Sequence, residues 1–213
     1  MSTTTEQPRR PLQYSGSLDG YQSFDLTPVI GREFPTLQLS SLLGDDRKIR
    51  DLAILVSQRG VLFFRNQDLQ LNDQKVLGQK LGELTGKPKT SKLHRHALVD
   101  KKSQSPIDGE KKADEEVMVI SSASAKNSHE AHKSSLKPLA STLWHADITF
   151  EHVPSDYAIL KMVVLPESGG DTIWASGYEA YDRLSPAWKR FAESLTATHR
   201  NVRLMERKAM CID

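Results

Sequence analysis

The sequence predicts a mainly β fold with flanking helices, of the α+β class. Three runs rich in β-branched and aromatic residues lie close together at 143–150, 157–165 and 171–176, and a fourth lies at 117–121. Amphipathic patterns with a helical period precede and follow these runs. The length of 213 residues and the hydrophobic content of 38% suffice for one domain with a core.

The first part of the chain has the pattern helix, strand, helix. Apolar residues at helical intervals predict a helix over 45–60, with one of its two leading aspartates as N-cap and Gly60 at its end. The run VLFFR that follows has the composition of a buried strand. A second helical pattern covers 72–84, where Asn72 or Asp73 is the expected N-cap.

Two shorter helices are predicted near the end of the chain. They cover GYEAYDRL at 177–184 and PAWKRFAESL at 186–195, the second with Ser185 as N-cap and Pro186 at its first position. The Lys- and Ser-rich segments 86–116 and 121–138 predict loops.

The charge of the chain is nearly balanced, with 29 Lys+Arg against 27 Asp+Glu. Such a balance argues against nucleic acid or an anionic membrane surface as partner and favours small molecules. The apolar stretch at 158–165 is far shorter than the roughly 20 residues that cross a bilayer. The polar N-terminus lacks the apolar segment of a secretory signal, so we expect a cytoplasmic protein.

A histidine and an aspartate stand two positions apart in the run LWHADITF. In a strand, residues i and i+2 face the same side, so His145 and Asp147 would present an imidazole nitrogen and a carboxylate oxygen together. Two histidines and one carboxylate on one face of a metal form the site of non-haem iron(II) oxygenases. With 7 histidines and 27 acidic residues, about one such spacing is expected by chance. A surface hydrogen bond is therefore the competing interpretation.

The residues around this pair resemble the taurine dioxygenase family of 2-oxoglutarate-dependent oxygenases. The resemblance runs through WHADITF, SGGDTIWAS and AYDRLS, and extends back to RGVLFFRNQ, LGELTGKPK and HRH. It covers roughly residues 24–199 and is similar in particular to the sulfonate dioxygenases of fungi. It implies a double-stranded β-helix, or jelly roll, of which this chain would hold a partial version with the C-terminal half missing.

The resemblance also implies the site residues and the cofactors. His145 and Asp147 would be two of the three ligands of Fe(II), and the hydroxyl of Thr172 would help to hold a carboxylate of the cosubstrate 2-oxoglutarate. His96 aligns with a substrate-side histidine, although the proline that follows it in the family is replaced. Ser141 stands where taurine dioxygenase has a substrate-contacting asparagine, so a sulfonate other than taurine is expected. The implied reaction uses molecular oxygen and releases sulfite and an aldehyde.

The chain departs from the family after His199. The third iron ligand and the arginine that pairs with 2-oxoglutarate have no counterpart, because His152 is too near the first ligand and His199 stands in a non-ligand context. We therefore expect a disordered leader at 1–22, a truncated dioxygenase domain at 23–199 and a divergent tail at 200–213.

Two further hypotheses stay open. An inactive fragment or pseudoenzyme would act only by association with another chain through an open sheet edge, which also favours homo-oligomers. A zinc hydrolase would use His94, His96 and His145, because zinc accepts three histidines and a water. Outside that hypothesis, His94 is expected to be a solvated loop histidine, and the three tryptophans are expected in the core.

Overall fold

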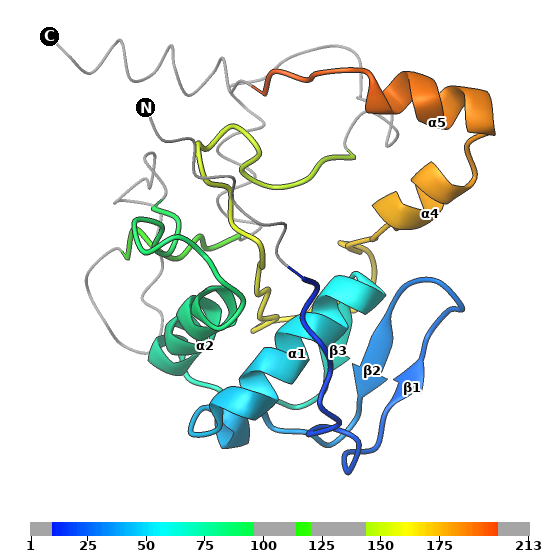
Figure 1. The fold of residues 1–213 in the computed structure, drawn as a ribbon. Helices are drawn as coiled ribbons and strands as arrows, with labels where there is room; N and C mark the ends of the chain where they lie inside the picture. Colours follow the sequence, from blue (N-terminus) through cyan, green and yellow to red (C-terminus); the bar gives the residue numbers. More distant parts are fainter. Residues whose placement is uncertain (1–9, 96–113, 121–143, 200–213) are drawn as a thin grey trace, which may run out of the picture. The chain divides into compact units, whose positions relative to one another are not determined.

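The computed structural model describes residues 10–95, 114–120 and 144–199 (Figure 1). The chain divides into two compact units. The first comprises residues 1–90 and 157–196, and the second comprises 91–156 and 197–213. Each unit is described by itself.

A small mixed sheet lies in the first unit. Its strands are β1 (Phe24–Asp25), β2 (Arg32–Phe34) and β3 (Leu62–Phe64), in the order β1-β2-β3. The first pair is antiparallel and the second is parallel. The rings of Phe34 and Phe64 stack across the parallel pair with their centroids 5.4 Å apart. The strand predicted from VLFFR is confirmed, because β2 provides its hydrogen-bonding partner. Its expected full burial is wrong, because all three residues of β3 are only partly buried.

A crossover through helix α1 (Asp46–Arg59) joins the two parallel strands, after the short 3-10 helix η1 (Leu39–Leu42) (Figure 1). Asp45 caps α1, because its carboxylate accepts a hydrogen bond from the Lys48 amide at 3.1 Å. Gly60 ends it with a φ of +71°, a left-handed conformation that glycine adopts without strain. The predicted helix over 45–60 is confirmed with both of its ends.

Helix α2 (Leu71–Glu83) is confirmed as an element, but its predicted N-cap is wrong. The N-cap residue is Gln70, whose side chain makes no capping hydrogen bond. Asp73 instead lies in the first turn, where its negative charge interacts favourably with the positive end of the helix dipole. The two helices pack together through Leu residues of α2 and the apolar face of α1, including Ile49 and Leu52, which are fully buried.

A buried carboxylate on α1 holds the segment that precedes the sheet. Asp51 is 1% exposed and accepts four hydrogen bonds, from the backbone amides and the hydroxyls of Ser15 and Ser17, at 2.7 to 2.9 Å. Burial by itself raises the pKa of Asp51, but the four donors outweigh it and the pKa lies below its usual value. We refer to this arrangement of Asp51, Ser15 and Ser17 as the serine clasp.

Helices α4 (Gly177–Asp182) and α5 (Pro186–Glu193) confirm the two short helices that the sequence predicts. Ser185 caps α5 through its hydroxyl, and Pro186 occupies the first turn, as expected. Among the helices that the structure describes, none combines the length and the apolar character needed to cross a bilayer.

Four predicted strands are wrong within the described residues. The runs at 117–120, 144–150, 157–165 and 171–176 contain no strand residue. Strand propensity depends on a partner, and none of these runs has a ladder of backbone hydrogen bonds. The stretch that begins at Tyr157 is held by side chains instead, since Gln74 donates to the Ile159 carbonyl at 3.2 Å and Lys161 to the Leu69 carbonyl at 2.7 Å. The described residues thus support an α+β class, but the double-stranded β-helix is not observed in them.

Candidate metal-binding site

The structure brings the two predicted iron ligands together. The Nε2 atom of His145 lies 3.1 Å from the Oδ1 atom of Asp147, and both side chains are about 70% exposed. They stand on an irregular stretch followed by a turn at 147–150, and not on the predicted strand. The side-by-side placement of imidazole and carboxylate therefore arises from a turn, although it was expected from strand alternation.

The turn that carries Asp147 has a strained backbone. Ile148 has a φ of +44°, in the left-handed region that β-branched residues rarely adopt. Such a conformation costs on the order of 1–3 kcal/mol and persists only where the surroundings hold it. One restraint is the backbone hydrogen bond from the Glu151 amide to the Ile148 carbonyl, at 3.0 Å.

A second restraint on this turn comes from a distant part of the sequence. The Nδ1 atom of His94 lies 3.5 Å from the Oε1 atom of Glu151. The side chain of His94 is only 18% exposed, so the expectation of a solvated loop histidine is wrong. Its neighbour Arg95 forms an ion pair with Glu115. The segment 91–95 thus contacts two other described parts of the second unit, 114–120 and 144–156.

The donor atoms at this site suit part of an iron(II) centre. An imidazole nitrogen and a carboxylate oxygen belong to the ligand set of non-haem iron(II) oxygenases. A separation of 3.1 Å between these two atoms is compatible with both being ligands of one ion. Among the described ranges 10–95, 114–120 and 144–199, no group of three or more His, Cys, Asp or Glu residues is arranged to hold a metal.

Thr172 lies in the first unit, on an exposed irregular stretch. Gly169 and Gly170 precede it with φ values of +75° and +72°, a left-handed conformation that glycine adopts without strain. His145 and Asp147 belong to the second unit, so the relation between Thr172 and this pair stays a prediction. The predicted substrate residue His96 lies outside the described residues, as does Ser141.

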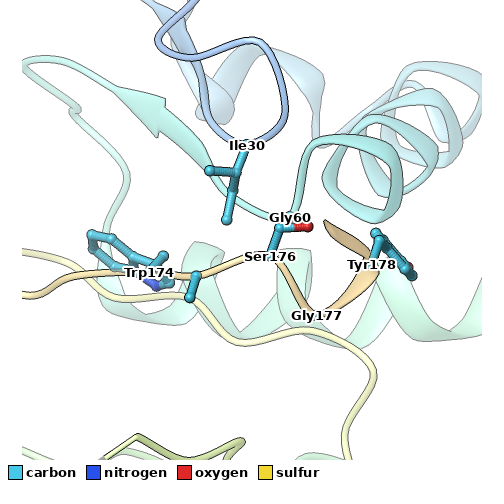
Figure 2. Close-up of a pocket in the computed structure, with 7 residues that line it drawn as sticks. Ile30, Gly60, Trp174, Ser176, Gly177 and Tyr178 are labelled. Atoms are coloured by element: carbon cyan, nitrogen blue, oxygen red, sulfur yellow. The ribbon is translucent and has the colours of Figure 1, made fainter. Parts of the chain in front are cut away.

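The first unit contains an apolar pocket that the sequence did not predict. It has a volume of about 200 Å³ and is lined by Ile30, Gly60 and residues 174–178 (Figure 2). The indole of Trp174, which is 41% exposed, packs edge-on against Phe63. Trp144 and Trp188 are 55% and 60% exposed, so the expectation of core tryptophans is wrong for all three.

An arginine fixes one wall of this pocket. The Arg59 guanidinium donates to the carbonyls of Thr27 and Gly31, at 2.7 and 3.1 Å, and to that of Pro28 at 3.3 Å. The Thr27 hydroxyl donates to the Ile30 carbonyl and accepts from the Ile30 amide. These bonds close the loop 27–31 tightly, and Figure 2 shows Ile30 directed from it toward the 174–178 segment.

Comparison with known proteins identifies the family of the chain. Residues 22–208 match the family described as "Taurine catabolism dioxygenase TauD, TfdA family". The chain belongs to this family. The TauD/TfdA match includes the His145-x-Asp147 pair and Thr172, and it confirms the resemblance found in the sequence.

Several curated relatives are named as α-ketoglutarate-dependent dioxygenases. The chain is 44% identical to btcD of Neocamarosporium betae, over 92% of this chain and 59% of the relative. It is 42% identical to oryG of Aspergillus oryzae, over 89% of this chain and 54% of the relative. An α-ketoglutarate-dependent sulfonate dioxygenase of Saccharomyces cerevisiae is 29% identical, over 82% of this chain and 38% of the relative.

This TauD/TfdA chain spans only 54% to 60% of the length of three curated relatives that it matches. No solved structure matches it significantly.

Proposed function

We propose that the chain is part of an iron(II)- and 2-oxoglutarate-dependent dioxygenase that hydroxylates an alkyl sulfonate and releases sulfite and an aldehyde. The observation that carries this proposal is the 3.1 Å approach of His145 Nε2 to Asp147 Oδ1, in a segment inside the family match. Both side chains are exposed, so a metal can reach them without any change in the core.

In this proposal each named residue has one role. His145 and Asp147 hold Fe(II), the carboxylate offsetting part of the metal charge while the neutral imidazole supplies a nitrogen lone pair. Thr172 donates its hydroxyl proton to a carboxylate of 2-oxoglutarate, without adding a charge that competes with the metal. His96 contacts the substrate. When bound, the metal and the cosubstrate supply the oxidising chemistry, with molecular oxygen as the oxidant.

The substrate class rests on the relatives. Sulfonate dioxygenases of Schizosaccharomyces pombe and Saccharomyces cerevisiae are 34% and 29% identical to the chain, and an alkylsulfatase of Acinetobacter baylyi is 30% identical. Two of the names specify a sulfonate and the third an alkyl sulfate, so all three indicate an organic sulfur oxyanion. The near-balanced charge of the protein supports a small-molecule partner, and we place the enzyme in the cytoplasm as part of the same proposal.

The domain organisation proposed for this enzyme keeps a dioxygenase domain that extends to residue 199 and a tail at 200–213. The disordered leader expected at 1–22 is wrong for residues 15–18, because Leu18 is 2% exposed and the hydroxyls of Ser15 and Ser17 donate to Asp51. The family match begins at residue 22 and ends at residue 208, within the proposed tail.

The test measures succinate and sulfite release from a series of alkyl sulfonates, with Fe(II) and 2-oxoglutarate present. It uses this chain and a chimera that adds the C-terminal part of the 44% identical relative. Asp147→Asn and His145→Asn in the chimera should lower turnover by at least about a hundredfold, because each removes a metal ligand.

Asp156→Asn and His152→Asn are the matched controls, since both residues are exposed and lie in the same segment. Both should leave turnover within about twofold of the parent. Equal turnover of Asp147→Asn and Asp156→Asn would contradict the assigned ligand, and absence of succinate coupled to every sulfonate would contradict the substrate class.

A further inference from the structure

A contact between two residues with no assigned role holds the turn that carries Asp147. His94 and Glu151 lie far apart in the sequence, yet their side chains meet at 3.5 Å within the second unit. The histidine is mostly buried at 18% exposure, whereas Glu151 is 44% exposed. A charged partner for a mostly buried histidine is a specific arrangement, because a solvated histidine would need none.

This contact bears on the candidate metal site, because Glu151 belongs to the turn that carries Asp147. Glu151 closes the turn through its backbone amide, which donates to the Ile148 carbonyl at 3.0 Å. Ile148 directly follows Asp147 and has the strained φ of +44°. A β-branched residue leaves this conformation unless other contacts hold it. Among the described residues, the backbone bond and the side-chain contact of Glu151 are the restraints seen on that end of the turn.

We infer that His94 and Glu151 are positioning residues, which hold the strained turn at Ile148 and thereby keep the Asp147 carboxylate beside the His145 imidazole. The metal-binding part of this inference rests on the proposed function, whereas the restraint on the turn does not. Release of the contact lets Ile148 relax to an ordinary conformation, which turns the preceding carboxylate away from His145. The effect on metal binding is therefore indirect, through the backbone.

The chain offers a closely matched control in the Arg95–Glu115 ion pair. Glu115 is 44% exposed, as Glu151 is, and its partner is the residue next to His94. Glu115→Ala and Glu151→Ala thus remove the same group, at equal exposure, from the same unit. They differ in that only Glu151 belongs to the turn of Asp147.

The first experiment measures hydrogen exchange of the Glu151 amide in the full 213-residue chain without metal. His94→Ala and Glu151→Ala should each speed this exchange by about two- to fivefold, the range expected when a partly exposed side-chain contact to a carboxylate is lost. His94→Ala in the background of Glu151→Ala should add little to this rate, because the contact between the two side chains is already lost in Glu151→Ala. Glu115→Ala should exchange as the wild type does. Equal rates in Glu151→Ala and Glu115→Ala would overturn the inference.

The second experiment titrates the same proteins with Co(II), whose visible absorption reports ligand binding at an iron(II) site. Glu151→Ala should weaken Co(II) binding by about two- to fivefold, while Glu115→Ala should not. Glu151→Gln keeps an acceptor oxygen for His94 and should restore part of the affinity. A purely structural role would lower the Tm of Glu151→Ala and leave Co(II) affinity unchanged, which would overturn the positioning role.

The two experiments separate the possible failures. If the wild type binds no Co(II) but Glu151→Ala still speeds exchange of the turn, the proposed function fails and the restraint on the turn stands. If the wild type binds Co(II) and both alanine variants bind it equally well, the proposed function stands and the positioning role fails.

Discussion

At the scale of single residues, the serine clasp is a buried charged group that depends on its hydrogen-bond donors. Four donors converge on the carboxylate of Asp51, which is 1% exposed. A buried carboxylate of this kind stabilises the fold only while donors are present for its oxygen atoms, because a buried polar atom without a hydrogen bond costs free energy. The clasp joins residues 15 and 17 to the middle of α1, so it fixes the chain that enters the sheet.

Asp51→Asn should lower the free energy of unfolding by about 2–3 kcal/mol, because an amide nitrogen would then face the donors of Ser15 or Ser17. Urea denaturation followed by circular dichroism measures this loss. Asp68→Asn is the control, since Asp68 accepts a 2.6 Å hydrogen bond from the Ser40 hydroxyl at an exposed position. Asp68→Asn should lower the free energy of unfolding by no more than about 0.5 kcal/mol. Equal losses in the two variants would show that the buried clasp has no special role.

The clasp also predicts how stability depends on pH. The pKa of Asp51 is lower in the folded protein than in the unfolded chain, so the unfolded chain binds this proton first as the pH falls. The stabilisation is complete above the unfolded value of about 4 and is lost progressively as the pH falls below it toward the folded pKa. Between pH 6 and pH 3, the free energy of unfolding should therefore fall more steeply with decreasing pH in the wild type than in Asp51→Asn. Parallel curves would contradict this origin of the acid sensitivity.

At the scale of elements, the junction of α1 and β3 depends on Gly60. Its φ is +71°, and a Cβ atom there would lie 3.1 Å from the Cδ1 and Cγ1 atoms of Ile30. Gly60→Ala should cost about 1–2 kcal/mol of stability, because an L-residue resists the left-handed conformation. It should also displace Ile30 from the pocket of Figure 2.

Thermal unfolding of Gly60→Ala and Gly44→Ala provides the comparison. Gly44 has an ordinary φ and open space where a Cβ would stand, so its replacement should leave the Tm within about 2 °C of the wild type. A similar Tm for both variants would mean that α1 does not need its glycine terminus.

Helices were predicted better than strands, because the interactions that define a helix lie within a few residues of one another in the sequence. Helix α1 and helix α5 depend on caps and periodicity within a few residues. Gly60 and Ser185 were identified from the sequence, and Asp45 was one of the two N-cap candidates for α1. Strands depend on partners elsewhere in the chain. The run after α1 formed β3 because Arg32–Phe34 pairs with it, yet β1 and β2 are too short and too charged to be recognised.

The candidate site shows the same limit. The closeness of His145 and Asp147 follows from their spacing of two residues, which brings side chains together in a strand or in this turn. The contact of His94 with Glu151 has no local signature, because it joins distant segments. The left-handed Ile148 was also not foreseen, since its β-branched side chain favours a strand.

At the scale of the whole molecule, an extended apolar run remains uncovered in the first unit. Val163, Val164 and Leu165 are 77%, 83% and 70% exposed, and Ile173 is 71% exposed. Exposed β-branched runs with free backbone groups pair readily with other chains. We therefore expect this 213-residue chain to self-associate as its concentration rises.

Val164→Glu should shift the sedimentation of the chain toward the monomer, because a charge in the middle of the run opposes strand pairing. Ser168→Glu adds the same charge at an exposed position nearby and should sediment as the wild type does. Neither change touches the core, so the Tm should not fall. Identical association of the two variants would exclude this run as the contact surface.

The buried core has a further consequence for how the protein is made. Every residue of its fully buried cluster lies between Leu18 and Leu81, on segments joined by the β2, α1 and β3 crossover. Because chains fold from the N-terminus as the ribosome releases them, this nucleus can be complete before His145 and Asp147 are translated. The proposed metal donors would then be synthesised only after this core has formed.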